Sequence, residues 1–144
     1  MSKKLLAILV MAMLVFAACG GDDGEGEGEE AAAGDRGECS GEVPGAADIP
    51  DLPENFPIPG EAVLTAASEA GPSQIIEGYF EADIENAFPE YEEAFESAGY
   101  DITKDEREED DAEIFFAGDG TTGQVNMFAE CDGRTKLRIT IRPD

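Results

Sequence analysis

The stretch IENAFPEYEEAFESAGY, residues 84–100, decides the fold, because its apolar residues return at every third or fourth position, the spacing of one helix face. The residues of that face are Ile84, Phe88, Tyr91, Phe95 and Ala98. Glutamates occupy many of the positions between them and would point to solvent. The stretch therefore predicts one amphipathic helix that must cover an apolar surface formed elsewhere in the chain.

Pro89 leaves two predictions open for the start of this helix. With Asn86 as N-cap, the proline would be the third helical residue, where its missing amide costs nothing. With Asp83 as N-cap, the proline would lie deeper and predict a kink. Gly99 is expected to end the helix in a Schellman cap, with the following tyrosine against Phe95.

Strand patterns lie on both sides of the helix. AVLTAAS and SQIIEGYFEA precede it, and YDITKD, AEIFFAG, GQVNMFAE and TKLRITIR follow it. Asp119 with Gly120, and Asp132 with Gly133, are hairpin signals between the later strands. The order ββαββββ predicts an α+β fold in two layers, an antiparallel sheet of about five to six strands with one helix packed on it.

Basic residues gather in the last strand pattern, TKLRITIR. Its leucine and isoleucines alternate with polar residues, so one side should face the core and the other should face solvent. The candidate partner-binding face is Arg134, Lys136, Arg138 and Arg142, four of the six basic residues from Val43 onward. The alternative is cross-strand pairing of these cations with acids on neighbouring strands, worth roughly a few tenths of a kcal/mol per pair.

The N-terminus has the pattern of a signal peptide. Lys3 and Lys4 precede an apolar run of twelve residues, Leu5 to Phe16. This run is too short to cross a bilayer, which takes about 20 residues. We therefore expect it to be removed.

The next residues, FAAC at 16–19, resemble the lipobox of bacterial lipoproteins, with Phe16 where leucine is usual. The resemblance implies that residues 1–18 are cleaved and that Cys19 carries diacylglycerol and a further acyl chain such as palmitate. Two or three acyl chains suffice for stable anchoring. The protein would then be anchored to the cell membrane and face outside the cytoplasm, at the cell surface or in a periplasm. An ordinary signal peptide with an unrelated cysteine is the alternative.

Composition divides the rest of the chain into two parts. Residues 19–42 are rich in glycine and acids, which predicts a disordered tether behind the lipidated cysteine. Residues 43–144 should form a single globular domain. Its leading segment LPENFPIPGEA, residues 52–62, resembles that of small uncharacterised bacterial lipoproteins, and Phe56 and Ile58 are expected to hold it on the domain.

Charge and cysteines narrow the function. Two of the nine basic residues leave with the signal peptide, so 34 acids face seven bases and the formal net charge is −27. This disfavours binding to nucleic acid. With Cys19 lipidated, Cys39 and Cys131 are expected to form a disulfide. Free thiols or a redox role are the alternatives.

Catalytic and metal signatures are sparse. The chain has no histidine, no Gly-x-Ser-x-Gly motif, no phosphate loop and no cysteine cluster. A hydrolase using carboxylates alone is the enzymatic alternative, and we assign no catalytic residue. The acidic run at residues 105–113 lacks EF-hand spacing, so weak calcium binding there is only an alternative to a solvated hairpin, and we expect no cofactor besides the lipid.

The sequence thus favours a lipid-anchored, non-catalytic binding or interaction domain, whose partner is the membrane through its anchor and an envelope protein through its folded part. A small-ligand carrier is the second hypothesis, with residues such as Tyr79, Phe88 and Tyr91 lining a space between helix and sheet.

Overall fold

The computed structural model describes residues 36–144, which lie in one compact unit. The predicted signal peptide, the lipobox and Cys19 lie outside the described residues. Among residues 36–144, no helix is both long and apolar enough to cross a membrane.

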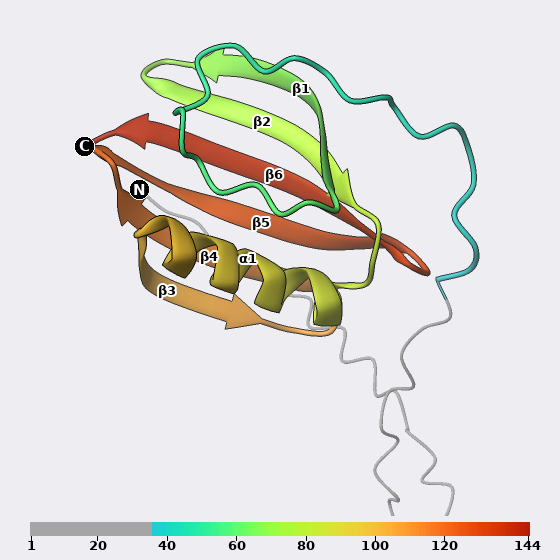
Figure 1. Cartoon of the computed structure of the whole chain (residues 1–144). Helices are drawn as coiled ribbons and strands as arrows, with labels where there is room; N and C mark the ends of the chain where they lie inside the picture. The colour runs from blue at the N-terminus through green and yellow to red at the C-terminus, as the bar shows by residue number, and fades with distance from the viewer. Residues whose placement is uncertain (1–35) are drawn as a thin grey trace, which may run out of the picture. The chain divides into compact units, whose positions relative to one another are not determined.

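Within residues 36–144, six strands form one antiparallel sheet, and a single helix lies against one of its faces (Figure 1). The elements are β1 (Ala62–Ala70), β2 (Ser73–Phe80), α1 (Ile84–Ala98), β3 (Asp101–Arg107), β4 (Asp111–Gly118), β5 (Thr121–Cys131) and β6 (Arg134–Pro143). Their order across the sheet is β1-β2-β6-β5-β4-β3. An antiparallel sheet with one helix is therefore confirmed for the described residues, and strands make up most of their regular secondary structure.

We distinguish two ends of the sheet. The disulfide end, named for the Cys39–Cys131 bridge described below, carries the β3–β4 turn and the β5–β6 turn with Gly133. At the far end lie the β1–β2 turn with Gly71 and the β4–β5 turn with Gly120. The ten residues of β6 separate these ends by about 30 Å at roughly 3.4 Å per residue.

The helix starts at the earlier of the two predicted positions. Asp83 is the N-cap, and its carbonyl accepts hydrogen bonds from the amides of Asn86 and Ala87. Asn86 as N-cap is therefore wrong. Pro89 lies inside the helix, where the carbonyl of Glu85 loses its usual donor. The Asp83 side chain binds the β5–β6 turn instead of the helix, because its Oδ1 accepts from the Gly133 amide at 2.8 Å.

The predicted end of the helix is confirmed. Gly99 adopts a left-handed conformation with φ 80°, which glycine reaches at little cost. Its amide donates to Glu96, and the Tyr100 amide donates to Phe95, as in a Schellman cap. The rings of Tyr100 and Phe95 meet edge to face with centroids 5.6 Å apart.

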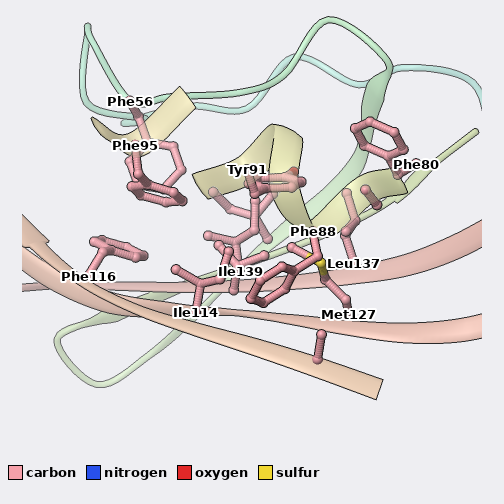
Figure 2. Packing of buried hydrophobic residues seen from close by; sticks show 14 of the residues in the cluster. Phe56, Phe80, Phe88, Tyr91, Phe95, Ile114, Phe116, Met127, Leu137 and Ile139 are labelled. Atoms are coloured by element: carbon pink, nitrogen blue, oxygen red, sulfur yellow. The ribbon is translucent and has the colours of Figure 1, made fainter. Parts of the chain in front are cut away.

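The core lies between the helix and the sheet (Figure 2). Its largest fully buried side chains include Tyr91, Phe80, Phe95, Phe116, Ile114, Leu137 and Ile139. Phe56 comes from the leading segment and packs against the rings of Phe95, Tyr100 and Phe116. The leading segment therefore completes the core, as expected for Phe56, and Ile58 packs against the same cluster.

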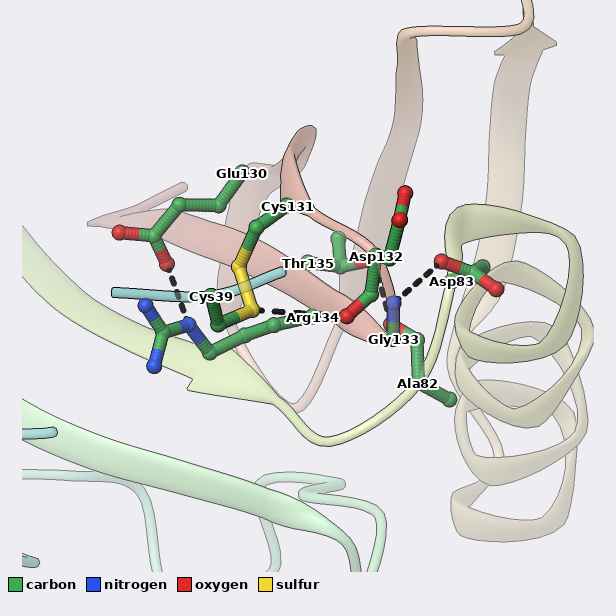
Figure 3. The surroundings of a disulfide bond; sticks show 9 residues. All are labelled: Cys39, Ala82, Asp83, Glu130, Cys131, Asp132, Gly133, Arg134 and Thr135. Atoms are coloured by element: carbon green, nitrogen blue, oxygen red, sulfur yellow. Dashed lines mark hydrogen bonds and ion pairs between the residues drawn. A yellow bond between two sulfur atoms is a disulfide. The ribbon is translucent and has the colours of Figure 1, made fainter. Parts of the chain in front are cut away.

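The segment before it is fixed at the disulfide end (Figure 3). Cys39 and Cys131 form a disulfide with Cα atoms 5.0 Å apart. Glu38 makes a parallel bridge with Asp132, whose amide donates to the Gly37 carbonyl at 3.1 Å. These contacts attach residues 37–39 to the β5–β6 turn.

Tyr91 carries a polar atom inside this core. Its side chain is fully buried, and its hydroxyl finds no hydrogen-bond partner among the described residues. A buried unpaired hydroxyl costs about 1–3 kcal/mol. We expect Tyr91→Phe to raise the free energy of unfolding by about 1–2 kcal/mol in urea titrations at pH 7. A loss of stability would mean that the hydroxyl is bonded in solution.

The same substitution should reduce the fall of the free energy of unfolding at alkaline pH. Burial raises the pKa of Tyr91 above its ordinary value, so the folded state holds this proton more tightly than the unfolded chain. Stability is therefore complete below about pH 10 and falls as pH rises above it, by about 1.4 kcal/mol per unit for this group. Urea titrations between pH 9 and 11 should show a shallower fall in Tyr91→Phe than in the native protein.

Candidate binding face on the outer side of the sheet

The helix α1 covers one face of the sheet, and no other helix of the described residues covers the second face, which we call the outer face (Figure 1). In β6 the alternation decides which residues reach it. Leu137, Ile139 and Ile141 are buried towards the helix, while Lys136, Arg138 and Arg142 are exposed. The predicted alternation of this strand is therefore confirmed.

Strand pairing sets the neighbours of two of these cations, because β6 lies between β2 and β5. Arg138 lies opposite Glu77 on one side and Asn126 on the other. Lys136 lies opposite Tyr79 and Phe128. Two cations thus share the middle of the outer face with an amide and two aromatic rings. We call Tyr79, Asn126, Phe128, Lys136 and Arg138 the central patch.

The four candidate residues do not form one cluster. Lys136 and Arg138 are two positions apart in the central patch, whereas Arg142 lies at the far end. Arg134 lies at the disulfide end, where its Nε is 2.8 Å from Glu130 Oε2 (Figure 3). Arg134 therefore follows the alternative of pairing with an acid on the neighbouring strand.

Lys136, Arg138 and Arg142 behave differently from Arg134. Within residues 36–144 none of the three has an ion-pair partner within 4.0 Å. Glu77 lies opposite Arg138 in the register but does not pair with it at that distance. Arg142 donates from Nε to the Thr122 hydroxyl at 3.1 Å. The outer face thus presents cations that have no ion-pair partner within the described part of a strongly acidic chain.

Tyr79 belongs to this face and not to the interior. The hypothesis of a small-ligand carrier placed it beside Phe88 and Tyr91, but it pairs with Lys136 on the opposite side of the sheet. Phe88 and Tyr91 do lie between helix and sheet, where they are buried in the core cluster. The space between them is filled by the protein's own side chains (Figure 2).

The sequence did not lead us to place three residues of the central patch, Tyr79, Asn126 and Phe128, on a binding face. Asn126 and Phe128 alternate along β5 with Val125 and Met127, so strand periodicity alone could have placed them on the outer face, where Phe128 is exposed and Asn126 is buried beneath its neighbours at 6% exposure. Phe128 is 45% exposed, which is unusual for so large an apolar side chain. The sequence alone did not show the strand order, which places β5 beside β6 and so brings these residues next to the cations.

The acidic residues show repulsion between neighbouring elements. The pKa of Glu92 is raised by partial burial and by the nearby charges of Asp105 and Glu96, while Arg107 lowers it. The acidic run at residues 105–113 spans the β3–β4 hairpin, and its Asp110 pairs with Arg36. Nowhere in the described part of the chain do three or more acidic or cysteine side chains gather in a group suited to a metal ion.

Comparison of the chain with protein-family models, with curated protein sequences and with solved structures gives no significant match.

Proposed function

We propose that this protein is a lipid-anchored, non-catalytic binding protein that acts outside the cytoplasmic membrane, at the cell surface or in a periplasm. The FAAC motif at residues 16–19 supports the anchor by its resemblance to a lipobox. The central patch is the proposed docking surface, and an envelope protein with an acidic surface is the proposed partner. The observation that carries this proposal is the pair Lys136 and Arg138, unpaired within the described residues.

The composition of the patch suits a protein partner. Aromatic residues and arginine are enriched where protein interfaces release most of their binding energy. Phe128 supplies exposed apolar area beside the cations, and Tyr79 supplies a second ring. Desolvating the two cations would be costly unless the partner offers carboxylates in return.

The net charge of the chain does not oppose this docking at short range. Charges separated by more than about 8 Å are largely screened at physiological ionic strength. Once the surfaces meet, the charges of Lys136 and Arg138 act at short range, and Glu77, which lies opposite Arg138, offsets only one of them. Association should be salt-sensitive, because complementary charges act mainly on the rate of encounter.

Photo-crosslinking tests the proposal in native membranes. A benzophenone amino acid at position 128 of the full-length protein should capture a reproducible partner, while the same probe at position 93, on the exposed side of α1, should not. Reversing both charges with Lys136→Glu and Arg138→Glu should lower capture at least tenfold.

Arg107→Glu with Lys104→Glu is the matched control, because it makes the same change of net charge on the edge strand β3. It should leave capture within twofold of the native protein. Equal loss in the two double variants would show that net charge, and not the central patch, decides the binding. An absence of partner at position 128 would remove the proposal.

A further inference from the structure

The outer face has a hollow towards its far end, where its β6 lining residues Thr140 and Arg142 lie about 20 and 27 Å from Arg134 at the rise of a strand. Its volume is about 360 Å³, within the range of about 300–1,000 Å³ typical of ligand pockets. Side chains of β4, β5 and β6 line most of it: Phe115, Ala117, Thr122, Gln124, Thr140 and Arg142. It does not include the central patch.

The lining residues carry many hydrogen-bonding groups and no carboxylate. The hydroxyls of Thr122 and Thr140 and the amide of Gln124 can each donate and accept, and Ser73 and Thr103 add hydroxyls at the margin. Among residues 36–144 no acid lines this hollow, although the chain has 34 acidic residues. The hollow therefore suits a ligand with several hydroxyl groups. Asp101 lies opposite the lining residue Ala117, and Asp51 and Glu69 line an adjoining hollow, so an anion needs the Arg142 guanidinium to be held here.

Phe115 gives the hollow an apolar wall. The Lys104 ammonium lies 5.4 Å from the centroid of this ring, so a cation approaches the ring from strand β3. Lys104 also lies 3.0 Å from Glu106 in an exposed ion pair. An aromatic ring beside hydroxyl and amide groups is a surface on which the C–H face of a sugar ring can pack while its hydroxyls are bound.

Arg142 supplies the charge. Its Nε donates to the Thr122 hydroxyl at 3.1 Å, which orients the guanidinium at the margin of the hollow. The remaining N–H donors of an arginine can bind a carboxylate or phosphate in a bidentate manner. Arg142 and Ser73 also line an adjoining hollow of about 240 Å³ between the β1–β2 turn and the end of β6, which leaves room for a second ring.

We infer that this hollow is a binding site for an acidic sugar, a hydroxylated ring that carries one anionic group. The ring lies against Phe115, its hydroxyls bond to Thr140 and Gln124, and its carboxylate or phosphate binds Arg142. This site lies beyond the proposed function, because it takes a small molecule at the opposite end of the face from the disulfide and uses none of the central patch.

Titration calorimetry on the full-length protein in detergent tests the site with three probes: glucuronate, glucose 6-phosphate and neutral methyl glucoside. At least one anionic sugar should bind, and it should bind at least tenfold more tightly than the neutral sugar. Arg142→Gln should weaken that binding at least tenfold. The two anionic probes tell a carboxylate ligand from a phosphate ligand.

Arg138→Gln is the matched control, because it removes the same charge from the same face of the same strand, four residues away. It should change sugar affinity by less than twofold. Gln124→Met, which keeps the size of the side chain, should weaken binding without a change in charge. No heat from either anionic sugar at 10 mM, or equal weakening by Arg142→Gln and Arg138→Gln, would overturn the inference.

The two proposals fail separately. If sugar binding is absent while crosslinking through position 128 persists, the proposed sugar site is wrong and the proposed docking surface is supported. If the sugar binds and no partner is captured, the docking surface is wrong and the sugar site is supported.

Discussion

Phe56→Ala is expected to lower the free energy of unfolding by about 3–5 kcal/mol, the usual cost of emptying a buried phenylalanine site. Phe56 is 7% exposed, and its ring lies 5.4–5.9 Å from the rings of Phe116, Phe95 and Tyr100. Truncation loses these edge-to-face contacts together with the buried area. Because small domains are stable by only about 5–15 kcal/mol, the loss should be plain in urea or thermal unfolding.

Phe128→Ala provides the control for this experiment. The side chain is of the same type but is 45% exposed on the outer face, so its removal should change stability by about 0.5 kcal/mol or less. If both variants lost the same free energy, or if Phe56→Ala lost less than about 1 kcal/mol, the leading segment would not be part of the core.

Phe56 also shows where sequence reasoning worked. The prolines around it exclude regular structure, yet an isolated phenylalanine among them was rightly expected to dock on the domain. The strands and the helix were likewise predictable, because the repeat of apolar residues every two or about 3.6 positions is visible within each short stretch of sequence. The Gly99 cap was predictable for the same reason, since glycine after an apolar helix face is a local signal.

The start of the helix could not be decided locally. Asn86 offered a better position for Pro89, but Asp83 is the N-cap, and its carboxylate bonds to the Gly133 amide, 50 residues away. The Thr135 hydroxyl likewise donates to the Ala82 carbonyl at 2.8 Å. Contacts with the β5–β6 hairpin thus fix the approach to the helix, and no window of sequence around Pro89 contains them.

The sequence could predict which face of its own strand each residue of the candidate site would occupy, but it could not predict which strands would lie side by side. Alternation in β6 rightly turned Lys136 and Arg138 outward. The helix, however, connects β2 to the edge strand β3 on the other side of the sheet, and β6 then lies beside β2. That crossover brings Tyr79 to Lys136, which is 57 residues away in the sequence. Alternation with the buried Phe80 could have turned Tyr79 outward, but only the strand order shows which residue lies beside it.

Removal of the disulfide is the second change with a large expected effect. Cys39→Ala with Cys131→Ala should lower the free energy of unfolding by about 2–5 kcal/mol, the usual cost for a native bridge in a small domain. The bridge joins residues 92 apart, and the chain-entropy model gives about 4.7 kcal/mol for a loop of that size. Alanine is the better replacement, because Cys131 is buried and a serine hydroxyl there would add a cost of its own. Urea unfolding of the native protein with and without reductant should reproduce the difference between native protein and variant.

The location of the bridge predicts a second, local effect. Without it, the Asp132 amide, which donates to Gly37 at 3.1 Å, should exchange its hydrogen faster than the global loss of stability explains. The Ile139 amide, in the middle of β6, should follow the global loss alone, because β2 and β5 flank it on both sides. Equal acceleration at both positions would mean that the bridge stabilises the whole domain uniformly. Faster exchange at Asp132 alone would mean that residues 37–39 are held on the β5–β6 turn by the disulfide and not by the hydrogen bonds around it.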